Sequence, residues 1–188
     1  IVPSRSWGGL LAAALFSLAS LPAHAQDRPS SPTAEDRATV AACLKLVAET
    51  GAREAAQSSP DEPASPQGRL EAASKDALSD PASCIGAVSI PCQQKPGGYS
   101  TAGMNECTAR EWAVWDERLN QAYRAALKDA GPKLTGTLKA TQRAWLAWRT
   151  QKCKLPAIEN EGGSIVGPLY LGCMMEATAR QAIWLGER

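Results

Sequence analysis

Three stretches of the chain place apolar residues at the three- and four-residue spacing of an amphipathic helix. The first is Thr141–Cys153, which extends upstream to Leu138, and the other two are Met104–Asp129 and Ile165–Leu185. The apolar members of the three stripes are Leu138, Trp145, Leu146 and Cys153; Trp112, Leu119, Tyr123 and Leu127; and Val166, Leu169, Cys173, Ala177 and Trp184. The pattern therefore predicts three long helices that pack through one face each.

Each predicted stripe also contains polar side chains. Arg149 lies within the first stripe, Asp116 at the centre of the second and Arg180 at the centre of the third; Gln142 and Asn120 accompany them. A charged group on an apolar face loses its hydration and needs a partner. We therefore predict a shared buried network of Asp116 with Arg149, Arg180 or both. In the alternative interpretation, the arginine stems pack while their guanidinium groups reach solvent.

Weaker helical patterns precede the three long ones. Ala34–Arg53 predicts a helix with Thr33 as its N-cap, and Arg69–Leu78 and Ala82–Ser89 predict short helices. Between them, the segment Gln57–Gly68 is rich in proline and serine and predicts a linker. No stretch has the alternation of a strand, so the predicted fold class is all-α, a small helical bundle stapled by disulfides.

Glycine and proline separate the predicted helices. Lys95–Gly103 and Asn160–Ser164 are glycine-rich turns, and Gly131 with the following proline ends the second long helix. Thr135 is the predicted N-cap of the next helix, and Pro156 is predicted to end or kink it.

The first 25 residues have the three parts of a secretory signal peptide. A basic residue, Arg5, precedes the short apolar run Leu10–Leu21, and Ala23–Ala25 supplies small residues for cleavage. The run is too short and too rich in alanine and serine for a transmembrane helix, although an uncleaved N-terminal anchor is the alternative. We predict a periplasmic or secreted protein with three parts: a signal peptide (1–25), an N-terminal extension (26–80) and a helical domain (81–188).

Charge and composition exclude several function classes. The chain has 20 basic and 19 acidic residues, and cleavage removes one basic residue, so the mature chain is neutral. Without a basic stripe, nucleic acid is not a predicted partner. The single histidine, His24, leaves with the signal peptide, so histidine-dependent triads and histidine metal ligands are excluded. No cofactor is predicted.

All six cysteines lie after the predicted cleavage site, and an even count in an exported chain indicates disulfides. Cys153 and Cys173 share the core-facing stripes of helices joined by a turn. Cys107 points away from the Asp116 face and is expected to pair with Cys92 in the segment before it. The predicted pairs are Cys43–Cys84, Cys92–Cys107 and Cys153–Cys173. A four-cysteine zinc site is disfavoured because paired C-x2-C spacings are missing.

Histidine-free catalysis would need paired carboxylates, as in glycoside hydrolysis. Glu106, Glu111, Asp116 and Glu117 are close in sequence. Asp116 has a better role as a counter-ion, and the other three fit a solvated helix face. We therefore predict that the protein is not an enzyme.

The candidate binding residues are the two glycine turns, with Gly97, Gly98 and Tyr99 in one and Gly162 and Gly163 in the other, together with Trp148. Trp148 and Trp115 fall at the edges of their stripes, where an aromatic side chain either borders a binding surface or packs at the margin of the core. The turns match no phosphate-binding pattern, so plain turns are the alternative interpretation.

Six motifs lie between Cys84 and Leu185. Together, in their order and spacing, they resemble the sequences of the family named for the lysozyme inhibitor LprI. They are CIGAVSIPC (Cys84–Cys92), STAGMNEC (Ser100–Cys107), REWAVWDERLNQAY (Arg110–Tyr123), QRAWLAWRTQKC (Gln142–Cys153), GGS (Gly162–Ser164) and CMMEATARQ (Cys173–Gln181). The resemblance implies a small exported helical protein of bacteria. The motif polar residues, Asp116, Asn120, Gln142, Arg149, Thr178 and Arg180, coincide with the predicted internal network.

The resemblance therefore implies an exported binding protein that inhibits lysozyme by occluding its cleft. The alternative is an envelope protein that binds another protein or a cell-wall fragment without inhibition. A hydrolase is the least favoured interpretation.

Overall fold

The computed structural model describes residues 31–57, 79–128 and 130–188. The predicted signal peptide, nearly all of the predicted linker and the helix predicted at Arg69–Leu78 lie outside these ranges. The described part is helical throughout and contains no strand, which confirms the all-α prediction. Its elements are α1 (Ala34–Gln57), the 3-10 helix η1 (Pro81–Cys84), α3 (Ser89–Gln93), α4 (Thr101–Lys128), α5 (Pro132–Glu159) and α6 (Val166–Gly186).

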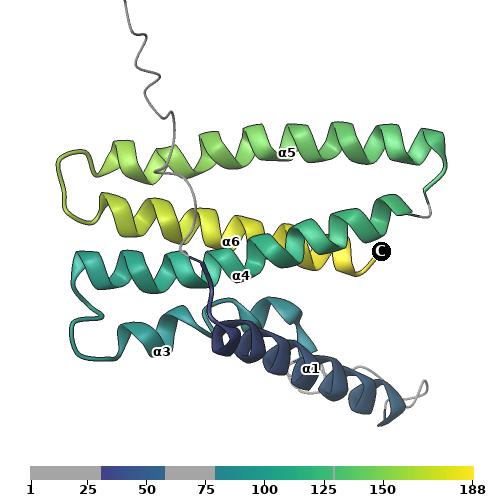
Figure 1. The fold of residues 1–188 in the computed structure, drawn as a ribbon, viewed down its shortest axis with the longest axis horizontal. Coiled ribbons are helices and arrows are strands. Elements are labelled where there is room, and N and C mark those ends of the chain that lie inside the picture. The colour runs from purple at the N-terminus through teal and green to yellow at the C-terminus, as the bar shows by residue number, and fades with distance from the viewer. Residues whose placement is uncertain (1–30, 58–78, 129) are drawn as a thin grey trace, which may run out of the picture.

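The helices are stacked, with α4 and α6 in the middle (Figure 1). These two helices run in the same direction and share the most extensive contact in the molecule. Helix α5 runs antiparallel to α6 and packs on its other side. Helix α1, η1 and α3 cover α4 on the side away from α5. Each central helix therefore has neighbours on two sides.

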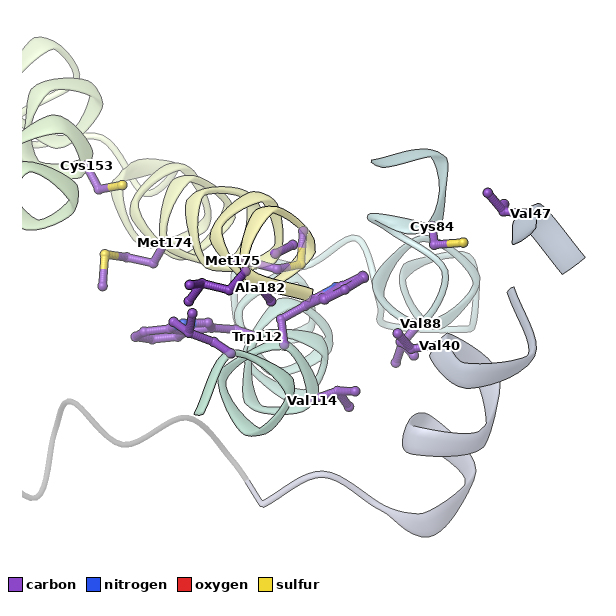
Figure 2. Packing of buried hydrophobic residues seen from close by; sticks show 14 of the residues in the cluster. Val40, Val47, Cys84, Val88, Trp112, Val114, Cys153, Met174, Met175 and Ala182 are labelled. Carbon is purple, nitrogen blue, oxygen red and sulfur yellow. The ribbon is translucent and has the colours of Figure 1, made fainter. Parts of the chain in front are cut away.

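The core lies between the central pair and continues towards α1. Figure 2 shows Trp112 of α4 beside Met174, Met175 and Ala182 of α6, all buried. On the α1 side, the buried residues are Val40, Val47, Cys84 and Val88. Burial of these apolar side chains supplies most of the driving force for folding.

The prediction that Arg180 lies at the centre of the buried stripe of α6 is wrong. Arg180 is exposed over 60% of its side chain and pairs with Glu176 one turn earlier, at 2.9 Å. Trp184 is also 37% exposed. The buried residues of α6 are instead Met174, Met175, Ala177, Thr178, Ala179, Ala182 and Leu185. Because α6 lies between α4 and α5, it buries two faces, and a single stripe does not describe them.

Two further helix-face predictions differ from the structure. Trp115, placed at a stripe edge, is fully buried, and Glu111, placed on a solvated face, is fully buried as well. Conversely, Leu146 on the predicted core stripe of α5 is 41% exposed, because α5 packs mainly against α6. Trp148 is 53% exposed and does not pack at the margin of the core.

All three predicted disulfides are present, with Cα–Cα separations of 5.8 Å for Cys43–Cys84, 5.6 Å for Cys92–Cys107 and 5.4 Å for Cys153–Cys173. No cysteine is left free for the zinc site considered as an alternative. One bond ties α1 to η1, one ties α3 to α4, and one ties α5 to α6.

The N-cap of α1 is the predicted Thr33. Its hydroxyl accepts from the Asp36 N–H at 3.1 Å, and the Asp36 carboxylate accepts from the Thr33 N–H at 2.8 Å, a reciprocal capping arrangement. Thr135 does not cap α5, which begins at Pro132 after Gly131. Pro156 lies within α5 and does not end it, since the helix continues to Glu159. None of the described helices is long and apolar enough to cross a membrane.

Candidate functional site

The most completely bonded polar group in the core is the carboxylate of Glu111 on α4. It accepts hydrogen bonds from the backbone N–H of Gly86 at 2.6 Å, Val88 at 3.0 Å and Ser89 at 2.7 Å. The indole N–H of Trp115, one turn later on α4, donates to it at 3.0 Å. Glu111 therefore fixes the turn between η1 and α3 against α4.

This arrangement gives Glu111 a structural role. All four donors belong to the protein and surround the carboxylate, which has no solvent exposure. A general acid or base must reach a substrate, and the buried Glu111 carboxylate has no path to one. Gly86 adopts a positive φ of 103°, a conformation that glycine tolerates, and this brings its N–H to the carboxylate.

Helix α1 is attached to α4 by two ion pairs. The Arg110 guanidinium donates to the buried Asp36 carboxylate at 2.5 and 3.2 Å, and Arg37 donates to Glu117 through two bonds of 2.7 Å. Burial opposes ionisation of Asp36, but the hydrogen bonds from Arg110 and Thr33 outweigh it and hold its pKa below the ordinary value. Asp36 is therefore an anchor for α1.

Arg149 of α5 lies in the interface with α6, as the sequence predicted, but its partners are not carboxylates. One guanidinium nitrogen donates to the Thr178 hydroxyl at 2.8 Å, and the group stacks over the Trp145 ring at 4.7 Å. The Thr178 hydroxyl also accepts from the Trp112 indole at 3.1 Å and donates to the Met174 carbonyl at 2.6 Å. Thr178 thus links all three long helices.

The predicted ion pair of Asp116 with Arg149 or Arg180 is not formed. The carboxylate of Asp116 accepts from Asn120 at 2.9 Å, within α4. Burial lowers the pKa of Arg149, and the attraction of Asp116 only partly offsets this effect. Nε of Arg149 is buried with no acceptor among the described residues. Gln142 does join α5 to α6, through a hydrogen bond from Gln181 at 3.1 Å.

The two predicted glycine turns lie at the same end of the bundle, on the left in Figure 1. We call this region, residues 94–100 and 160–165, the loop end. Contact between Gly167 and Asn105, at the starts of α6 and α4, is consistent with that placement. Each turn is enclosed by a disulfide, Cys92–Cys107 for the first and Cys153–Cys173 for the second.

The candidate residues of the loop end differ in accessibility. Tyr99 is 70% exposed, and Gly97, Gly162 and Gly163 are exposed too. Gly98 is buried. A Cβ there would lie 2.4 Å from the Gln93 carbonyl oxygen, so only glycine fits. Trp148 lies apart from the loop end, on the outer side of α5, where Lys152 stacks on it at 5.1 Å.

A pocket of about 200 Å³ lies between α1, α4 and α6, where no candidate residue had been predicted. Leu44, Trp115, Ala182 and Ile183 form apolar walls, and Arg118 lines it with a pKa lowered by burial. In the described ranges, no group of three or more histidine, cysteine, aspartate or glutamate side chains is arranged to hold a metal ion.

Sequence reasoning missed Glu111 because its partners are backbone N–H groups, which have no sequence signature. The one local hint was Trp115 four residues later, whose indole can reach back to a carboxylate. Asp36 was also missed, although the T-x-x-D spacing after Thr33 resembles a capping box.

Comparisons with known proteins agree with the sequence resemblance. The family described as "Lysozyme inhibitor LprI" matches residues 92–185, half of the chain. An uncharacterized protein of Rhizobium meliloti (strain 1021) is 32% identical over 101 residues, covering 47% of this chain and 73% of the relative. An uncharacterized 17.7 kDa protein in the puhA 5′ region of Rhodobacter capsulatus is 23% identical over 116 residues, covering 54% and 72%. No solved structure matches. The chain therefore belongs to the LprI lysozyme inhibitor family.

Proposed function

We propose that this protein is an exported bacterial binding protein that inhibits lysozyme by occluding its substrate cleft, without chemistry of its own. Membership of the LprI family supports the partner. The observation that carries the mode of action is the loop end, where two disulfide-enclosed glycine turns lie together and one presents an exposed tyrosine.

The rigidity of the loop end favours binding. The first turn is fixed by its disulfide, by the Ser100 hydroxyl donating to the Gly97 carbonyl at 2.7 Å, and by the Gly103 N–H donating back to that hydroxyl at 3.0 Å. A loop that is already ordered loses less conformational entropy on binding than a flexible one. Tyrosine is frequent among the residues that dominate interface energies. Tyr99 is therefore the proposed anchor, with Gly97, Gly162 and Gly163 allowing close approach.

Three of the described carboxylates, Glu111, Asp36 and Glu117, have structural roles. Glu111 is buried under four donors, and Asp36 and Glu117 are held by arginines. These three groups are therefore engaged in holding the fold, and inhibition would act by steric exclusion. Location in the periplasm or outside the cell is consistent with three disulfides.

The test is a cell-wall clearing assay in which the mature, oxidised protein is titrated into lysozymes of several types. We expect inhibition that saturates at a stoichiometric ratio. Tyr99→Ser should weaken inhibition at least about tenfold, the effect of losing about 1.4 kcal/mol at an interface. Leu46→Ser is the matched control, because Leu46 is 60% exposed on α1, away from the loop end.

Two results would overturn the proposal at different points. No inhibition of any lysozyme would refute the partner and favour a non-inhibitory envelope protein. Inhibition unchanged by Tyr99→Ser would keep the partner but refute occlusion by the loop end.

A further inference from the structure

Helix α5 has a large apolar surface that the fold does not cover. Only Leu138 and Cys153 of its 28 residues are buried. Trp148 is 53% exposed, Leu155 57% and Ile158 66%, and three exposed alanines lie nearby in the helix: Ala140, Ala144 and Ala147. We call the surface formed by these six residues the α5 outer face.

Helical geometry places this face opposite the attachment to α6. At about 100° per residue, Leu155 lies about 20° and Ile158 about 80° to one side of Trp148. The buried Leu138 and Cys153 lie about 80° and 140° to the other side. The exposed apolar residues therefore share one side of α5, together with Lys133, Gln151 and Glu159, in the outermost layer of the molecule (Figure 1).

The same helix carries an excess of positive charge. It has six basic residues, Lys133, Lys139, Arg143, Arg149, Lys152 and Lys154, and one acidic residue, Glu159. By contrast, α4 has four of each sign and α6 has one of each. The ion pairs formed among the described residues involve α1, α4 and α6 and leave the basic groups of α5 without a carboxylate.

Basic residues border the α5 outer face. Arg143 and Lys154 lie about 140° and 120° from Trp148 on the side of Ile158, and Lys152 lies about 40° away on the other side. The Lys152 ammonium stacks on the Trp148 ring at 5.1 Å. An apolar strip with an aromatic residue and with lysine and arginine at its edges is the pattern of a helix that lies in a membrane interface.

We propose that the α5 outer face docks the protein on an anionic phospholipid surface. The helix lies parallel to the membrane, with Trp148, Leu155 and Ile158 at the boundary of headgroups and acyl chains. Arg143, Lys152 and Lys154 then lie at the level of the phosphates. The association is peripheral, since α5 is not apolar enough to cross a bilayer.

The charges argue against a second copy as the occupant. Two α5 outer faces in contact would bring together the basic residues that border them, Arg143, Lys152 and Lys154 of each copy. Like charges at close range repel, most strongly where the interface excludes water. An anionic surface removes this repulsion. The proposal is independent of lysozyme inhibition, which is assigned to the loop end.

The test is co-sedimentation of the oxidised protein with vesicles of phosphatidylcholine, with or without phosphatidylglycerol. We expect binding only to the anionic vesicles, and loss of binding at about 1 M salt, where screening is strong. Replacing Arg143, Lys152 and Lys154 together by glutamine should weaken partitioning about 100-fold, because each basic residue near an anionic surface contributes about a fivefold factor. Trp148→Ser should also weaken binding to the anionic vesicles.

The matched control replaces Lys45, Arg124 and Lys128 by glutamine, which removes the same charge from exposed positions on α1 and α4. We expect this variant to retain most of the wild-type binding. Equal loss in both triple variants would overturn the proposal, because net charge alone would then explain binding. Absence of binding to anionic vesicles at low salt would overturn it as well. This holds even if an acidic protein binds to the α5 outer face instead.

Discussion

The two sides of the central α4–α6 pair are attached in different ways. On one side, η1, α3 and α1 are held to α4 by buried carboxylates, Glu111 and Asp36, whose oxygens all have donors. On the other side, α5 is held to α6 by a disulfide and by Arg149, whose Nε has no acceptor within the described part of the chain. We call these the anchored side and the open side.

The comparison shows that the buried charges of the two sides differ in how completely they are hydrogen-bonded. The anchored side encloses two carboxylates, Glu111 and Asp36, and supplies both with donors, so removal of either charge is costly. The open side buries a charge incompletely and leaves much of its helix in solvent. Surface for partners is therefore available on the open side and at the loop end.

The largest expected effect tests the anchored side. Glu111→Gln should lower the free energy of unfolding by about 3–5 kcal/mol, because the amide nitrogen cannot accept and leaves buried N–H groups unpaired. Chemical denaturation at neutral pH measures it. Glu106→Gln, an exposed position on the same helix, should have little effect. Equal midpoints for both variants would contradict the anchoring role of Glu111.

The disulfides extend the comparison to covalent attachment. Removing Cys43–Cys84 by serine substitution of both residues should cost about 4 kcal/mol, because this bond closes a 41-residue separation. Removing Cys153–Cys173, with a separation of 20, should cost about 3 kcal/mol. Thermal unfolding of the two variants gives the order, and a reversed order would show that native-state strain outweighs loop entropy.

A smaller effect concerns the pH dependence of the α1 attachment. The pKa of Asp36 is lower in the folded state than in the unfolded state, so its stabilisation is complete above about pH 4 and is lost as the pH falls through the folded pKa. Asp36→Asn should therefore cost about 1–3 kcal/mol at pH 7 and less near pH 2, which is below the unfolded pKa. Melting temperatures at the two pH values measure it, and a gap that is independent of pH would refute the assignment.

The smallest effect is expected on the open side. Arg149→Met should change the free energy of unfolding by less than about 1 kcal/mol, since the methionine fills the space and Thr178 keeps its bonds to Trp112 and Met174. Asp116→Asn should be similarly mild, because its carboxylate bonds only to Asn120. If denaturation shows a loss of unfolding free energy above about 3 kcal/mol in either variant, the result would support the predicted Asp116–Arg149 ion pair.

Local features of the sequence predicted much of the fold. The spacing of apolar residues located the three long helices, and Thr33 was identified as a cap from its position before the first of the weaker patterns. Two disulfides followed from the helix face or the chain neighbours of their cysteines, and Cys43–Cys84 was the pair that remained. The glycine turns were predicted as well, although their placement at one end required the packing of α4, α5 and α6.

The sequence by itself determined the fold class and the cysteine pairs, because helical periodicity and covalent reach act over short distances. Tertiary structure decided which faces are buried. A helix with neighbours on two sides buries two faces, so Glu111 and Trp115 became core residues while Arg180 and Trp148 remained exposed. Only the packed backbone could supply the N–H groups that bind Glu111, because the turn that presents them is brought to α4 by folding.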